Sequence, residues 1–215
     1  MTDNNAKHER LLRAILRLML RKGLKGLTMD LLASDLSMSK RTLYEIFGSK
    51  HQLIAETLDY MFGKMDDKCR EIFETAPNSI SALAEMFHLN GELLNILTIA
   101  FFHDIDTLYP DIGKIYKEKR DDAILKWGGL YKRGVSEGVF RENVNIVVLY
   151  AMMTVQMEAL KRMEGKFAGM FTLQEIYHTI TSGFLRSIAS HKGLEIIESF
   201  QPRNINEHYL DFLNE

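Results

Sequence analysis

Cationic, hydroxyl and aromatic side chains gather in one short segment near the amino end of this 215-residue chain, SKRTLYEIF at residues 39–47. On a helix of about 3.6 residues per turn, Leu43, Ile46 and Phe47 share one side and must face a core. The opposite side and its flanks carry Lys40, Arg41, Thr42, Tyr44 and Glu45. Cations neutralise phosphate, whereas hydroxyl groups and aromatic rings contact base edges and thymine methyl groups. A helix with this polarity suits the major groove of DNA.

Capping residues predict how this segment is held. Thr28 precedes a short run with apolar residues at helical spacing and is a candidate N-cap. Ser39 is the candidate N-cap of the segment itself, and Gly48 is placed to end it. The stretch at residues 37–39 is short and polar at both ends, which suits a turn between the two helices. The pattern therefore predicts a helix-turn-helix.

A third helix is predicted to start directly after this pair. Ser49 and Gln52 form an S-x-x-Q capping box, which brings backbone N–H groups and Lys50 together at a helix N-terminus, a natural clamp for phosphate. The residues expected to contact the groove are Lys40, Arg41, Thr42 and Tyr44. Those expected to contact phosphate are Thr28, Ser39, Tyr44 and Lys50.

The charge of the chain is divided unevenly. The whole chain has a formal net charge of −2, but residues 1–50 hold ten Lys or Arg against five Asp or Glu. The remainder is correspondingly acidic. This asymmetry favours a basic module that meets a polyanion, attached to an acidic body that does not. We therefore expect a DNA-binding domain over residues 1–50 and a helical domain over residues 51–215.

Long periodic apolar stretches and only 3 Pro predict an all-α fold. The first helix should cover about residues 7–22 and stop at Gly23, and the fourth should cover 49–75. Residues 79–108 form one helix or a helix with a break near His103. Further helices are expected over 110–137 and 145–163, and after Thr172, which makes a second capping box with Glu175. A small docked helix is expected after Pro202.

The amino-terminal quarter resembles the DNA-binding segment of the tetracycline-repressor (TetR) family of bacterial transcriptional regulators. The matching residues are Gly23, Thr28, Leu32-Ala33, Ser39-Lys40, Thr42-Leu43-Tyr44, Phe47, Ser49-Lys50 and Leu53. The chain departs from the family at Ser37, where the turn usually carries glycine. A serine there must either accept a positive φ or take a slightly different turn.

The resemblance implies a homodimer, in which the two long apolar C-terminal helices build a four-helix interface, and a body cavity for a small-molecule effector. Apolar and aromatic residues with one amide could line that cavity, or could simply fill the core. They are Phe87, Phe101, Phe102, Trp127, Tyr131, Met153, Gln156 and Met157.

Other classes of function find little support. No nucleophile motif, phosphate loop or carboxylate pair is evident, so we expect no enzyme and no cofactor. His103-Asp104-x-Asp106 with His88 lacks further ligands at metal-binding spacing, so we expect no metal. The single Cys fits a reducing compartment, and the start of the chain shows no signal peptide and no apolar run long enough for a membrane span. A cytoplasmic protein is expected.

The sequence therefore predicts a dimeric TetR-type regulator that represses transcription, binds a double-stranded DNA operator and is released by a small-molecule effector. One alternative is a helix-turn-helix regulator without an effector, whose body serves dimerisation or a protein partner. Another is a helical ligand-binding or enzymatic protein with a vestigial helix-turn-helix.

Overall fold

In the computed structural model, the described residues are 2–94, 96–97, 99–160 and 170–202. They form helices joined by short connections, with one isolated bridge between Phe140 and Ala189, which confirms the all-α prediction. The helices are α1 (Thr2–Gly26), α2 (Met29–Asp35), α3 (Lys40–Phe47), α4 (Lys50–Thr75), α5 (Ser79–Leu93), α6 (Ile99–Leu108), α7 (Pro110–Ser136), α8 (Ile146–Leu160), α9 (Leu173–Ile188) and α10 (His191–Ser199). The small helix expected after Pro202 lies outside the described residues.

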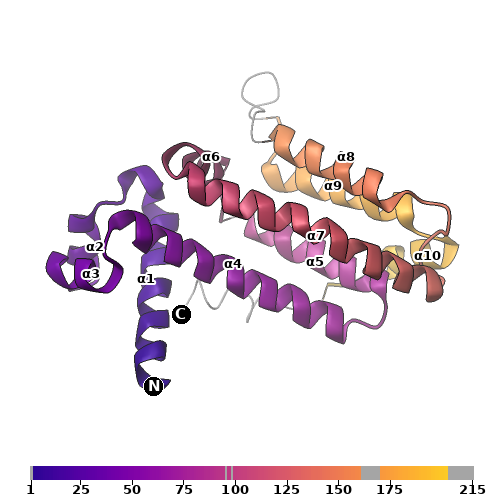
Figure 1. Cartoon of the computed structure of the whole chain (residues 1–215). Helices are drawn as coiled ribbons and strands as arrows, with labels where there is room; N and C mark the ends of the chain where they lie inside the picture. Colours follow the sequence, from indigo (N-terminus) through magenta and orange to yellow (C-terminus); the bar gives the residue numbers. More distant parts are fainter. Residues whose placement is uncertain (1, 95, 98, 161–169, 203–215) are drawn as a thin grey trace.

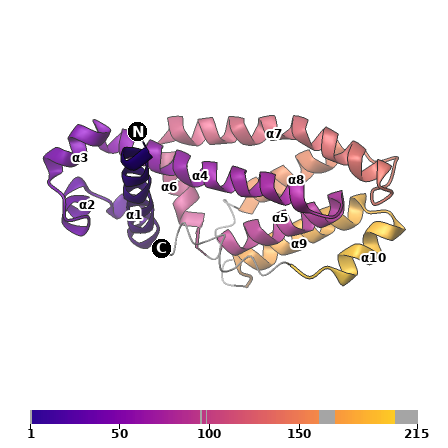
Figure 2. The same cartoon turned by 90° about the horizontal axis from the view of Figure 1, so that it is seen from below.

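The molecule is elongated, and α2 and α3 lie at one end of it (Figure 1). The yellow α10 lies at the other end, and α4 and α7 run lengthwise between the two ends (Figure 2). Helices α1, α2 and α3 thus lie away from α8, α9 and α10, whereas α4 extends into the body.

Helix α1 begins at Thr2, earlier than predicted, because its first residues are polar and give no apolar spacing to detect. The predicted stop at Gly23 is present as a kink, where φ is 70° and ψ is 162°. The helical assignment continues beyond the kink to Gly26. The glycine therefore turns the chain toward α2, as the sequence indicated.

The turn between α2 and α3 has a definite hydrogen-bond pattern. The Met38 N–H donates to the Ala33 carbonyl at 2.9 Å, and the Ser37 N–H donates to the Ser34 carbonyl at 3.3 Å. This pair of bonds is the Schellman arrangement, which places the residue after the helix end in the left-handed region. Ser37 occupies that position with φ of 52°. The serine thus accepts the positive φ, and the turn itself keeps the form that usually selects glycine.

An amino-terminal cluster of buried apolar residues holds α1 to α4 together and continues into α6 and α7. Leu43 and Phe47 of α3 are 0% and 1% exposed, and they belong to this cluster. Helix α4 contributes Leu53, Ile54 and Leu58. Helix α4 begins at Lys50, and the buried cluster continues across this position into the helices that follow.

A second cluster, with residues from α5, α7, α8, α9 and α10, forms the interior of the rest of the body. A break does separate α5 from α6, but it comes earlier than predicted, because α5 ends at Leu93, α6 begins at Ile99 and His103 lies within α6. Pro110 starts α7 as predicted, because its missing N–H is not needed in a first turn. Thr172 and Glu175 form the expected capping box of α9. Helix α10, which packs against α5, was not predicted.

Replacing Ser37 with glycine should raise the free energy of unfolding by roughly 0.5–1 kcal/mol, since a left-handed residue with a Cβ is strained and glycine is not. Urea denaturation of the purified chain measures the change. Ala33→Gly, within α2, is the matched control and should lower stability by about 0.5–1 kcal/mol. A loss of stability in Ser37→Gly would contradict the assignment of strain to this position.

Candidate nucleic-acid interface

Helix α3 presents two different faces. Leu43 and Phe47 point into the amino-terminal cluster, whereas Tyr44 is 45% exposed and the Arg41 side chain is 88% exposed. The prediction that Ile46 also faces the core was wrong, because that residue is 41% exposed. An eight-residue helix that rests on Leu43 and Phe47 leaves Ile46 at the edge of the contact. The outward face is therefore polar, with one apolar side chain beside it.

The caps that orient this helix are those indicated by the sequence. The Thr28 Oγ1 accepts from the Leu31 N–H at 3.1 Å, and the Ser39 Oγ accepts from the Thr42 N–H at 3.0 Å. The Ser39 and Thr42 hydroxyl groups lie 2.8 Å apart. Each cap satisfies an N–H group that the helix itself cannot pair. These hydroxyl groups thus already serve the local structure.

The two cations at the start of α3 are each held by a carboxylate. Lys40 Nζ lies 2.8 Å from Asp30 Oδ1 on α2, and this hydrogen-bonded contact raises the pKa of Lys40 above its ordinary value. Arg41 Nε lies 2.8 Å from Glu45 Oε1, one turn further along α3. Both pairs are exposed, so each contributes little to the stability of the fold.

The first turn of α4 adjoins α3. The Ser49 Oγ accepts from the Gln52 N–H at 3.0 Å, and Lys50 is half-buried beside it. All seven predicted DNA-binding residues therefore belong to the end of the molecule that carries α2 and α3 (Figure 1). Of these, Thr28, Ser39, Lys40, Arg41 and Tyr44 are exposed, and Thr42 and Lys50 are half-buried.

Ion pairs link this end to the body. His51 Nε2 lies 3.0 Å from Asp111 Oδ2, which joins the start of α4 to the start of α7. The hydrogen bond from His51 lowers the pKa of Asp111 below its ordinary value. Lys25 Nζ lies 3.1 Å from Asp104 Oδ1, which joins α1 to α6. Sequence reasoning missed these pairs, because nothing local relates residues so far apart in the chain.

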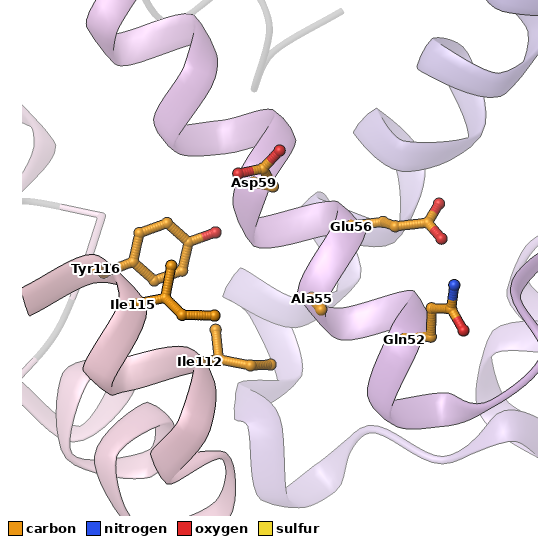
Figure 3. Close-up of a pocket in the computed structure, with 7 residues that line it drawn as sticks. All are labelled: Gln52, Ala55, Glu56, Asp59, Ile112, Ile115 and Tyr116. Carbon is orange, nitrogen blue, oxygen red and sulfur yellow. The ribbon is translucent and has the colours of Figure 1, made fainter. Parts of the chain in front are cut away.

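A groove of about 330 Å³ lies beside these links, between α4 and α7 (Figure 3). The α4 side is lined by Gln52, Ala55, Glu56 and Asp59, and the α7 side by Ile112, Ile115 and Tyr116. The residues predicted to line an effector cavity are not among them. The groove marks the place where the helix that follows α3 meets the body.

The structure divides the residues predicted to contact an effector. Phe87, Met153, Met157 and Tyr131 belong to the second cluster, whereas Phe101 is buried in the amino-terminal cluster. Phe102 is half-buried and packs edge-on against Phe101. The Tyr131 hydroxyl donates to the backbone carbonyls of residues 141 and 142, which leaves it a structural role. Gln156 is exposed, and the Trp127 side chain lies outside the described part.

Neither a group of metal ligands nor a membrane-spanning helix is found among the described residues. Among them, no three His, Cys, Asp or Glu side chains are grouped to hold a metal ion. The rings of His88 on α5 and His178 on α9 lie with their centroids 6.4 Å apart. No helix in the described ranges combines the length and the apolar character needed to cross a membrane.

Comparison with known proteins agrees with this geometry. Residues 11–57 match the family of bacterial regulatory proteins described as the tetR family. The chain is 25% identical over 137 residues to the HTH-type transcriptional repressor KstR2 of Mycolicibacterium smegmatis. That alignment covers 60% of this chain and 65% of the relative, which is less than two thirds of the relative's length.

Solved structures share the whole fold. A TetR transcription regulator from Haloarcula marismortui has a TM-score of 0.67 at 15% identity, covering 87% of this chain and 100% of that one. The ketosteroid transcriptional regulator KstR2 of Mycobacterium tuberculosis has a TM-score of 0.56 at 17% identity, covering 85% and 94%. This chain therefore carries the DNA-binding segment of the tetR family over residues 11–57, and its helix-turn-helix and helical body have the fold of these regulators.

Proposed function

We propose that this protein is a homodimeric repressor that binds an operator through α3 and is released by a small-molecule effector. The observation that carries the proposal is the polarity of α3, which buries Leu43 and Phe47 and exposes Arg41 and Tyr44. Two copies of this helix would read a near-palindromic site, with half-sites about 34–36 Å apart or a multiple of that distance.

The proposed contacts follow from where the side chains lie. Lys40, Arg41, Thr42 and Tyr44 are proposed to contact base edges in the major groove, and Thr28, Ser39, Tyr44 and Lys50 to contact phosphate. The exposure of most of them supports this assignment. Because the pair with Asp30 is exposed, Lys40 can exchange its carboxylate for DNA at small cost. Arg41 contacts Glu45 through Nε, which leaves its two terminal nitrogens for DNA.

Dimerisation is proposed to use the outward faces of α8 and α9, which pack side by side. Val147, Val148, Met152 and Val155 of α8 are each more than half exposed in the single chain. Gly183 of α9 is exposed, with open space around its Cα. A contiguous apolar surface of this kind is unfavourable in water, and a second copy would cover it.

The effector is proposed to bind within the body, where Phe87, Met153 and Met157 share one cluster. Methionine adapts its shape, which suits a site that admits a small apolar molecule. A ligand that binds the DNA-incompetent conformation more tightly lowers operator affinity by the ratio of its affinities for the two states. The ion pairs from α1 and α4 to α6 and α7 are the contacts through which such a preference would reach α3.

The proposal is tested by a mobility-shift titration with the DNA that flanks this protein's own gene. We expect a discrete complex that survives an excess of random duplex, because specific sites are typically bound about 10³-fold or more tightly than random DNA. Equal affinity for the flanking DNA and for random duplexes of the same length would contradict operator binding at that locus.

Replacing Lys50 with alanine should weaken binding to operator and random duplex alike, because a phosphate contact carries no sequence information. The slope of log K against log salt should fall by about one ion per subunit. Lys68→Ala, which removes a cation further along α4, is the control and should leave the slope unchanged. An unchanged slope for Lys50→Ala would remove that residue from the phosphate contacts.

Replacing Val155 with lysine should convert the dimer into monomers, because a charge would then be buried in the apolar interface. Sedimentation velocity of the 24.8 kDa chain distinguishes the two states. Ile115→Lys places the same charge at a half-exposed apolar position on α7 and should leave the dimer intact. A dimeric Val155→Lys protein would place the interface elsewhere.

A further inference from the structure

The outward face of α3 carries one acidic residue, Glu45, beside the groups proposed to meet DNA. Its Oε1 accepts from Arg41 Nε at 2.8 Å, and the side chains of Arg41 and Glu45 are 88% and 60% exposed. A carboxylate on a surface that approaches phosphate opposes binding to every sequence. Glu45 therefore lowers the affinity for DNA of any sequence. If it has a benefit for binding, that benefit must lie in discrimination between DNA sequences.

The geometry of the pair indicates what that gain is. A guanidinium has five N–H donors in a rigid plane, and the contact with Glu45 occupies the Nε donor. The two terminal nitrogens remain available as a fork, which matches O6 and N7 of guanine in the major groove. A side chain that is restrained before binding also loses less rotational freedom on binding.

The other cation at the start of α3 is held differently. Lys40 reaches back to Asp30 on α2, so its carboxylate partner belongs to a neighbouring helix and not to α3 itself. An ammonium is a point charge on a flexible stem and has no planar fork to orient. The Lys40–Asp30 pair would thus affect DNA binding through its charge alone, and it supplies a matched comparison for the Arg41–Glu45 pair.

We propose that Glu45 is a positioning residue for sequence specificity: it holds the Arg41 guanidinium so that its terminal nitrogens read one guanine in each half-site. On a sequence without that guanine, Arg41 gains no bidentate contact with a base, and the Glu45 carboxylate still repels the phosphates of the DNA. The pair therefore raises the ratio of specific to random binding. This inference rests on the proposed entry of α3 into the major groove.

The test selects bound sequences from a random duplex library with the full chain. The parent protein should favour guanine at one position in each half-site. Glu45→Ala should reduce that preference about tenfold, within the range that a bidentate arginine–guanine contact supplies, and should bind random duplex more tightly. Asp30→Asn should also bind random duplex more tightly, but it should keep the guanine preference.

A double-mutant cycle separates positioning from a general effect of charge. In an Arg41→Ala background, Glu45→Ala should change nothing further at that base pair, because the residue that it positions is gone. Retained preferences at the other positions show that the variant is folded and docked as before.

Three results would overturn the inference: an unchanged guanine preference in Glu45→Ala, an equal loss of preference at every position, or the same loss in Asp30→Asn. A parent protein that selects no sequence at all would instead overturn the proposed function, so the two failures can be told apart.

Discussion

The packing of Leu43 and Phe47 beneath α3 is the contact on which the rest of the structure depends. A helix of eight residues is too short to be stable by itself in water, so tertiary contacts must fix both its existence and its orientation. Burial of each of these side chains is worth about 1.5–3 kcal/mol. Because those residues must point inward, Arg41, Tyr44 and Glu45 must point outward. The same burial thus gives the helix both its stability and the outward polar face that is proposed to contact DNA.

Helices α1 to α4 pack directly against the body, in addition to being joined to it along the chain. The amino-terminal cluster joins α1 to α4 with the buried side chains Phe101, Ile105 and Ile112 from α6 and α7. Ion pairs from Lys25 and His51 cross the same junction. A shift of α6 or α7 would therefore disturb contacts that hold α1 and α4, and only two residues separate the end of α3 from the start of α4. In the proposed function, this arrangement is the route by which a ligand bound in the body would change the spacing between the two α3 helices of a dimer.

The sequence predicted best those features that depend on residues close together in the chain. Thr28 and Ser39 cap the starts of α2 and α3, and Gly48 ends α3. Each of these contacts spans at most four residues, and the predictions were confirmed. Periodicity placed Leu43 and Phe47 correctly but not Ile46, since a helical wheel does not show how wide the contact surface is. It also placed the break in residues 79–108 too late, because apolar residues continue at helical spacing through it.

Contacts between residues far apart in the chain could not be predicted from local sequence patterns. The His51–Asp111 pair joins residues 60 apart, and only the packing of α4 against α7 brings them together. The effector residues were chosen by type alone, and the fold then distributed Phe87 and Phe101 between two separate clusters. Helix α10 was missed because its apolar residues are few and its position depends on α5.

Hydrogen–deuterium exchange of the full chain, with and without the operator duplex, tests the central claim most directly. If α3 keeps Leu43 and Phe47 inward and presents Arg41 and Tyr44 to DNA, the operator should slow exchange across residues 39–50 and leave α5 and α10 unchanged. Slowed exchange in the body with no change across residues 39–50 would contradict the account.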